Sequence, residues 1–105
     1  MIVVTTNEIE GTKIYDYLGI ATGVIVRQPT IGQGLRGSWN ISGGKNNAYT
    51  EACEETRNEA FDEMVEHAIR KGANAIIGMR YDASEFSDGV TEVIAYGTAV
   101  NVGSA

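Results

Sequence analysis

The sequence predicts an α+β domain in which one long amphipathic helix packs on an antiparallel β-sheet. Residues 48–70 are rich in Glu and Ala, and their apolar residues recur at helical spacing. Residues 15–27, 74–83 and 90–102 alternate their side chains as strands do and are rich in β-branched residues. With 105 residues, 43% of them apolar, the chain suffices for one hydrophobic core, and we expect residues 1–105 to form a single domain.

Two strands are expected before the helix. Residues 2–5 are apolar and β-branched and predict a short strand, which a polar turn follows. Residues 15–27 predict a long strand with two different faces, because successive side chains point to opposite sides of a pleated sheet. The bulky face carries Leu18, Ile20, Val24 and Val26, and the smaller face carries Tyr17, Gly19, Ala21, Gly23 and Ile25.

A Gly-rich stretch over residues 30–47 predicts a long loop before the helix. The helix is expected over 48–70, with Gly72 as its C-cap. Acidic residues gather opposite its apolar stripe and are expected to face solvent. The stripe consists of Ala60, Phe61, Met64, Val65, Ala68 and Gly72.

An antiparallel hairpin is expected after the helix, because the pair Asp88-Gly89 between the last two strands is typical of a tight turn. The last strand again has a small face and a bulky face. Its small residues are Ala95, Gly97 and Ala99, and its bulky ones are Val90, Ile94, Tyr96, Val100 and Val102. Small side chains let a helix approach a sheet closely, so we expect the helix to lie on the small face.

The bulky face of the sheet predicts self-association. One helix covers only one face of a sheet, and monomers seldom expose an apolar patch beyond a few hundred Å². We therefore expect the bulky face to pack against another copy of the chain.

Charge and composition exclude several classes of partner. Eight Lys and Arg against 14 Asp and Glu give a formal net charge of −6, which is the wrong sign for a nucleic-acid partner. No stretch approaches the roughly 20 apolar residues of a membrane span, so no membrane partner is expected. With one Cys and no recognisable secretion signal, the expected location is the reducing cytoplasm.

The lone cysteine and the lone histidine limit any metal site or catalytic set. Cys53 and His67 are 14 residues apart on the expected helix, which is roughly 21 Å along its axis, so they cannot share a metal within one subunit. A site would combine copies of Cys53, or Cys53 and Glu54 with carboxylates of another chain. Alternatively, Cys53 is a small half-buried hydrophobe and His67 a boundary residue. An enzyme is the class supported least, because no spacing singles out catalytic residues.

Arg57 is a second candidate, because the same angular placement puts it near the middle of the apolar stripe. A guanidinium there needs a partner, and Glu54, Asp16 or Asp82 would supply a buried or interface ion pair. Alternatively, Arg57 binds an anion and faces the Gly-rich loop.

The loop itself carries weak ligand signals. Its Gly-x-Gly-x-x-Gly string at Gly32 is not followed by a helix, as the dinucleotide fingerprint requires. Gly43 and Gly44 resemble the end of a phosphate loop, but Asn46 stands where Ser or Thr would bind magnesium. Trp39 would stack on a flat ligand. Together with Arg57, these residues form the candidate site for a flat or anionic metabolite.

The whole chain resembles the YbjQ family, small bacterial proteins of unknown function that are described as heavy-metal-binding. The likeness lies in residues 2–6, 17–23, 42–44 with Tyr49, the helix residues Arg57, Ala60, Met64 and Ala68, then 72–78 and 96–100. The resemblance implies a dodecin-like subunit, a ring that is a pentamer, and a heavy-metal ion as the ligand, for which Cys53 and Glu54 are the candidate contacts named above. A ligand-free structural or interaction scaffold and a metabolite binder remain the alternatives.

Overall fold

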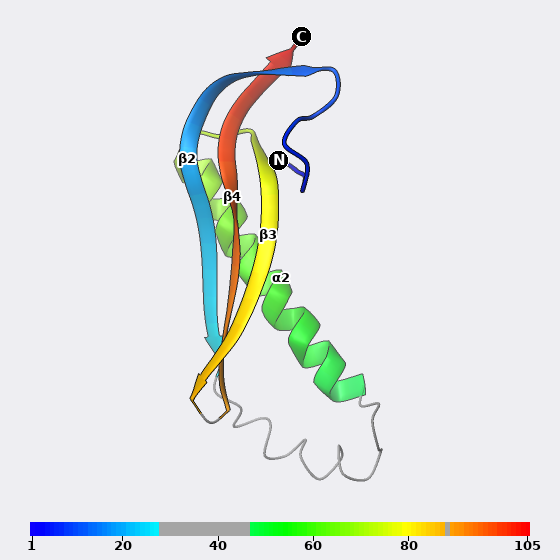
Figure 1. The fold of residues 1–105 in the computed structure, drawn as a ribbon, viewed down its shortest axis with the longest axis vertical. Coiled ribbons are helices and arrows are strands. Elements are labelled where there is room, and N and C mark those ends of the chain that lie inside the picture. Colours follow the sequence, from blue (N-terminus) through cyan, green and yellow to red (C-terminus); the bar gives the residue numbers. More distant parts are fainter. Residues whose placement is uncertain (28–46, 88) are drawn as a thin grey trace.

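The computed structural model describes residues 1–27, 47–87 and 89–105 and confirms the α+β class. The expected loop residues 30–46 lie outside this range. Figure 1 shows an elongated molecule, 55 × 23 × 17 Å, with one helix on one side of a sheet. The elements in chain order are β1 (Ile2–Val3), β2 (Thr12–Arg27), α2 (Asn47–Arg70), β3 (Ala75–Ser87) and β4 (Val90–Ser104).

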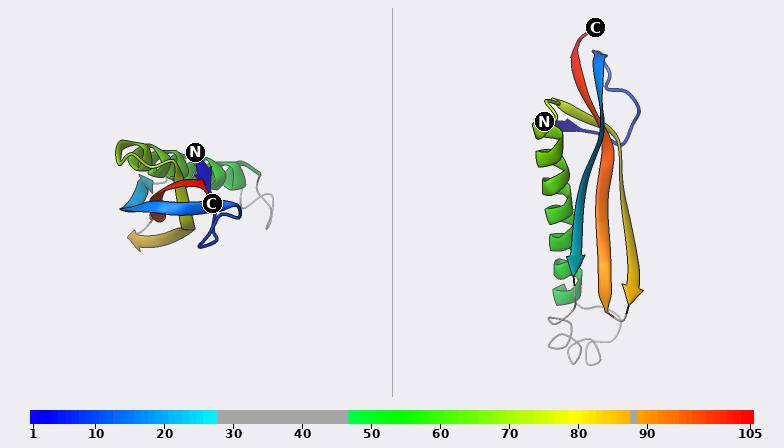
Figure 2. Two further views of the ribbon diagram at one scale, coloured as in Figure 1. Left: turned by 90° about the horizontal axis from the view of Figure 1, so that it is seen from above. Right: turned by 90° about the vertical axis from the view of Figure 1, so that its left-hand side faces the viewer.

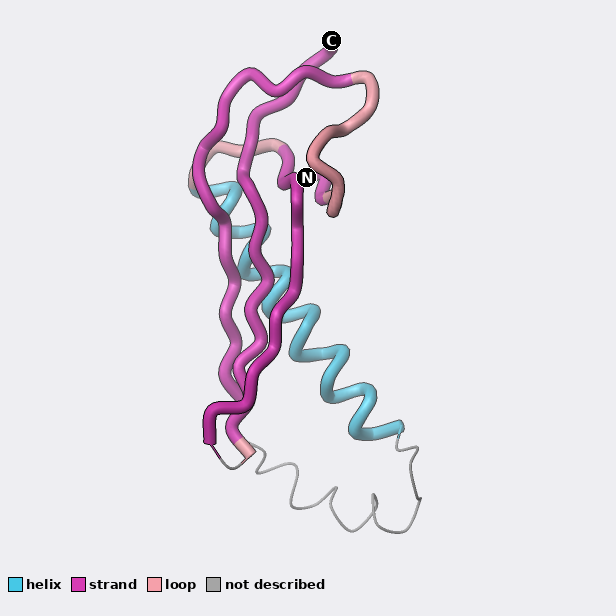
Figure 3. The backbone as a smooth tube through the Cα atoms, in the orientation of Figure 1, coloured by secondary structure: helices cyan, strands magenta, loops and turns pink. Residues whose placement is uncertain are grey.

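The sheet is mixed, whereas the sequence predicted an antiparallel one. Its strand order is β1-β3-β4-β2, and the three long strands pair antiparallel, as expected. Figure 3 shows the long strands side by side along the molecule. The short β1 runs parallel to the start of β3, with Ile2 opposite Ala75. A parallel neighbour needs a long crossover connection, here all of β2 and α2, and a two-residue strand carries no pattern that reveals its partner.

The helix packs on the face that carries small residues, as predicted. Figure 2 shows α2 running along the sheet beside β2. A Cβ added to Gly23 would lie 2.0 Å from the carbonyl oxygen of Ala60 and 2.6 Å from the backbone nitrogen of Met64. The backbones of strand and helix are therefore in direct contact. The core between them includes Ala21, Ala60, Met64, Ala68, Ile76, Met79, Val93, Ala95 and Ala99.

One irregularity of β2 changes the predicted faces. The β2–β4 register shifts between Tyr17 and Gly19, and Gly19 has a φ of 100°. A bulge adds one residue and so reverses the alternation of side chains beyond it. Leu18 consequently packs against the helix-side core and not on the bulky face, and Tyr17 is exposed. At Gly97 the space for a side chain is filled by β3, whose Ile76 Cγ2 would lie 2.6 Å from an added Cβ.

One end of the second face is covered by the N-terminal segment of the same chain. Ala75, Ile77 and Val100 form a second buried cluster there, against which other apolar residues pack. These are Val4, Ile9, Ile14 and Val102. The Arg80 side chain holds this segment in place by donating from Nη1 to the carbonyl oxygen of Thr5 at 2.9 Å. The uncovered part of the second face is therefore shorter than the sequence predicted.

The turn from α2 into β3 is fixed by Gly72 and Asn74. Gly72 has a φ of 89° and ends the helix, as expected of a C-cap, and the N–H of Ala73 donates to the carbonyl oxygen of Ala68. The Asn74 side chain then pairs with β4 as a strand backbone would. Its Nδ2 donates to the Val102 oxygen and its Oδ1 accepts from the Val102 nitrogen, both at 2.9 Å.

Replacing Asn74 with alanine is expected to lower the free energy of unfolding by about 1 to 2 kcal/mol, because two hydrogen bonds to β4 are lost together. Chemical unfolding followed by circular dichroism measures the change. Asn58→Ala is the matched control, since Asn58 is exposed on α2 and alanine is the better helix former. Equal stability of the Asn74 variant and the wild type would contradict the assigned role.

Candidate functional site

The uncovered part of the second sheet face, which we call the open face, exposes several large apolar side chains. Residues directly opposite each other on neighbouring strands share a face. The register therefore aligns Thr22 with Tyr96 and Arg80, and Val24 with Ile94 and Asp82. Four large side chains of this face are strongly exposed: Ile20 at 64%, Val24 at 39%, Val26 at 55% and Tyr96 at 37%.

The chain is more extended than a compact domain of its length. Its radius of gyration is 17.0 Å, whereas a compact domain of 100 residues has about 13 Å. Apart from the end that the N-terminal segment covers, the long strands carry a covering layer on one side only, the side of α2 (Figure 2). The open face is therefore a surface suited to another protein layer, and its flat extent does not resemble a ligand pocket.

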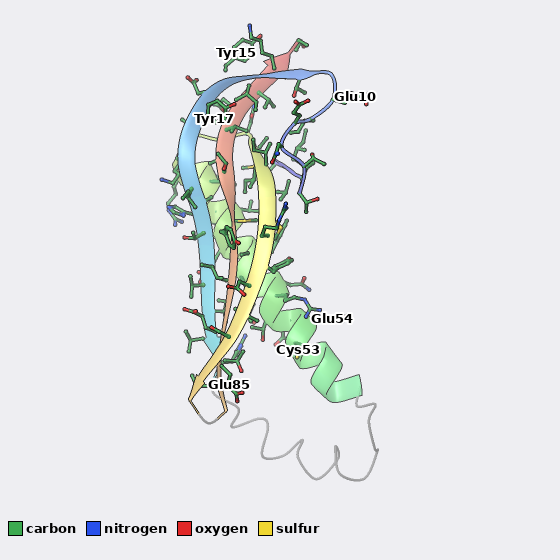
Figure 4. The ribbon with its side chains drawn as sticks, viewed as in Figure 1. Glu10, Tyr15, Tyr17, Cys53, Glu54 and Glu85 are labelled. Atoms are coloured by element: carbon green, nitrogen blue, oxygen red, sulfur yellow. The ribbon has the colours of Figure 1, made fainter. Side chains whose placement is uncertain are left out.

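Cys53 and Glu54 lie on α2, toward the end of the molecule opposite Tyr15 and Tyr17 (Figure 4). The Cys53 thiol is free and half-buried, and Glu54 is exposed. Across residues 1–27, 47–87 and 89–105, no group of three or more His, Cys, Asp or Glu side chains is placed to hold a metal ion. The described residues of one copy therefore do not fit a heavy-metal ion.

His67 has a structural contact that the sequence did not predict. Its Nδ1 accepts a hydrogen bond of 3.0 Å from the backbone N–H of Thr22 on β2. A neutral imidazole that accepts at Nδ1 carries its proton on Nε2 and has no lone pair left for a metal. The pattern showed only a boundary position on the helix, because the partner is a backbone group of a distant strand.

Arg57 is exposed, so the predicted place in the middle of the apolar stripe is wrong. The residues that α2 buries follow one row with a spacing of four, Thr56, Ala60, Met64 and Ala68. Such a row winds around the helix by about 40° per step, since four residues turn it by roughly 400°. A straight stripe averaged over the whole helix misplaces Arg57 toward the core. Arg57 remains available as a surface cation near Glu54, three residues earlier.

The remaining candidates, Trp39, Gly43 and Gly44, lie outside the described residues.

In the part of the chain that the structure does describe, an ion pair joins Arg27 at the end of β2 to Glu59 of α2. Both side chains are substantially exposed, so this pair adds little to stability. Over the same residues, no helix is both long and apolar enough to span a membrane.

Known proteins resemble the chain over almost its whole length. Residues 1–103 match a family described as "Putative heavy-metal-binding", YbjQ. A UPF0145 protein of Legionella pneumophila is 54% identical over 101 residues, covering 95% of this chain and 96% of the relative. A UPF0145 protein of Francisella tularensis is 48% identical over 105 residues, covering 97% and 99%.

A solved structure shares the fold. It is a protein of unknown function from Pediococcus pentosaceus, assigned to the DUF74 family, with a TM-score of 0.59 and 19% identity over 98% of each chain. That likeness extends to the arrangement of the helix and the sheet. The match to the family over residues 1–103, together with relatives near 50% identity, establishes that the chain belongs to the YbjQ (UPF0145) family.

Proposed function

We propose that this protein is a cytoplasmic homo-oligomeric binding protein in which the open face of each copy packs against a different surface of the next copy, and in which the copies hold a heavy-metal ion between them. The open face is the observation that carries the proposal, since it exposes Ile20, Val24, Val26 and Tyr96 together. Removing such a face from water gains about 25 cal/mol per Å² of apolar surface, which offsets the entropy that the chains lose on association. A pentameric ring is the assembly that the family resemblance implies.

A heavy-metal site in this assembly has to combine residues of several copies. Cys53 is the chain's one thiol, and soft metal ions prefer thiolate ligands. Exposed Glu54 adds a carboxylate next to Cys53 in the sequence. His67 is not counted as a ligand, because its Nδ1 already accepts a hydrogen bond from Thr22. A ring multiplies each of these residues by its number of subunits, which turns one thiol per chain into a ligand set. No catalytic residues are part of this proposal.

Replacing Cys53 with serine is expected to abolish binding of Cd²⁺ by the assembled protein while the assembly keeps its mass. Serine preserves the size of the side chain and removes the soft ligand. Elemental analysis after Cd²⁺ loading and desalting measures the metal per chain, and native mass spectrometry measures the mass. Glu54→Gln is the second variant, expected to weaken binding without eliminating it. Absence of Cd²⁺ uptake by the wild type, or equal uptake by Cys53→Ser, would contradict the metal site.

A ligand-free structural or interaction scaffold is the second candidate. It is favoured by the lack of a metal-ligand cluster among the described residues. A scaffold keeps its assembled mass and takes up no metal in either Cys53 form. A metabolite bound by the Gly-rich loop near Arg57, Trp39, Gly43 and Gly44 would instead appear in native mass spectra as a retained mass on each chain.

A further inference from the structure

Besides the packing at Gly23 and the ion pair of Arg27 with Glu59, the His67 side chain links α2 to the edge of the sheet along β2 by a hydrogen bond. In the strand order β1-β3-β4-β2, β2 is an edge strand, so every second N–H group points away from β4. Thr22 has such an outward N–H, and it donates to Nδ1 of His67 at 3.0 Å. The imidazole therefore occupies the position that a neighbouring strand's carbonyl would take.

This hydrogen bond exists in only one protonation state of the imidazole. Nδ1 accepts from Thr22 through its lone pair, which requires the neutral ring with its proton on Nε2. Protonation at Nδ1 consumes the lone pair and turns the acceptor into a donor. Two donors then face each other, and the bond between His67 and the backbone of Thr22 is lost.

The surroundings of His67 offer the protonated ring another set of partners. A shallow hollow of about 430 Å³ is lined by Thr22, Glu63, Glu66, His67 and Arg70. Glu63 and Glu66 stabilise an imidazolium, and so does the C-terminal end of α2, where His67 is in the last turn. The positive charges of Arg70 and Lys71 disfavour the imidazolium. The Lys71 side chain extends toward β2, where its Nζ would lie 3.7 Å from a Cβ on Gly19. Thr22 is the lining residue from β2, and it has no titratable group.

We propose that His67 is a proton-controlled latch between α2 and the edge of the sheet. In its neutral form His67 caps the N–H of Thr22 and closes the edge of β2. On protonation the ring turns within the hollow toward Glu63 and Glu66 and leaves the N–H of Thr22 uncapped. An uncapped edge N–H is open to water or to the backbone of another strand. Acidification that protonates the ring therefore frees the edge of β2 locally, at the N–H of Thr22. This latch does not depend on the proposed metal site, since it uses neither Cys53 nor Glu54.

The test compares amide exchange at about pH 7.5 and about pH 5.5, on either side of the histidine range. In the wild type, the protection of the Thr22 amide, corrected for intrinsic exchange, is expected to fall about five- to tenfold at the lower pH, the loss of one hydrogen bond. The protection of the Ala21 and Gly23 amides should change less, because those groups point toward β4. Nitrogen-15 spectra of the imidazole should show an unprotonated Nδ1 at the higher pH.

His67→Asn is the matched variant, because the amide oxygen of asparagine takes the place of Nδ1 and does not titrate. Its Thr22 protection is expected to be the same at both pH values. Thr22 protection in the wild type that does not change with pH would overturn the latch. A proton on Nδ1 at about pH 7.5 would do so too, and so would His67→Asn showing the same fall as the wild type. The wild-type titration decides the question even if the variant does not fold.

Discussion

Gly23→Ala is expected to lower the free energy of unfolding by about 3 kcal/mol or more, which is a large part of the stability of a small domain. The added methyl group would lie 2.0 Å from the Ala60 oxygen and 2.6 Å from the Met64 nitrogen, and both are backbone atoms of α2. A backbone cannot turn aside as a side chain can, so the helix must move off the sheet. Urea unfolding at a fixed protein concentration measures the loss.

Gly11→Asn is the control for Gly23→Ala. Gly11 has a φ of 81° and nothing within 4 Å of an added Cβ, and asparagine tolerates this backbone conformation better than other side chains. This variant should remain close to the wild type in stability. An unchanged unfolding midpoint for Gly23→Ala would show that α2 does not pack against β2 as described.

Val24→Glu, alone or with Ile20→Glu, is expected to dissociate the assembly into folded monomers. Both side chains are exposed on the open face, so a carboxylate there meets water in the monomer and costs its fold little. In the assembly, the same carboxylate would be buried against an apolar surface without a partner. Light scattering coupled to size-exclusion chromatography gives the mass, and circular dichroism verifies the fold.

Ile69→Glu is the matched control for the open face, because Ile69 is 57% exposed but lies on α2. It introduces the same charge and is expected to leave the assembled mass unchanged. An assembled mass that survives Val24→Glu together with Ile20→Glu would place the interface elsewhere on the molecule.

The sequence was a good guide where a pattern repeats over many residues. The amphipathic period of 48–70 and the alternation around Asp88-Gly89 predicted α2 and the β3–β4 hairpin to within a few residues at most boundaries. The contrast of small and bulky residues on the strands predicted which face α2 covers. These features repeat locally, so no knowledge of distant contacts is needed to recognise them.

Prediction was wrong where a single residue or a distant partner decides the structure. The bulge before Gly19 moved Leu18 to the other face, and nothing in an alternating pattern marks where it is interrupted. The parallel pairing of Ile2 with Ala75 depends on a crossover connection that runs from the end of β1 at Val3 to the start of β3 at Ala75. The burial of Arg57 was mispredicted because the contact row winds around α2 instead of following its axis.

The candidate site was predictable in part. That the second face is bulky and apolar followed from the strands, but its covering by Val4 and Ile9 at one end did not, since irregular segments have no period. The contact of His67 with Thr22 joins a side chain to a backbone group 45 residues away, and backbone donors leave no trace in a sequence. Cys53 is half-buried, as its interpretation as a small hydrophobe predicts, and its use as a ligand shared between copies stays a prediction.

The most direct test of the account is the native mass of the unmodified protein at micromolar concentration. If other copies cover the open face, the measured mass is a whole-number multiple of the chain mass. The family resemblance predicts a multiple of five. The monomer mass throughout that range would contradict the account, because it would leave Ile20, Val24, Val26 and Tyr96 exposed to water.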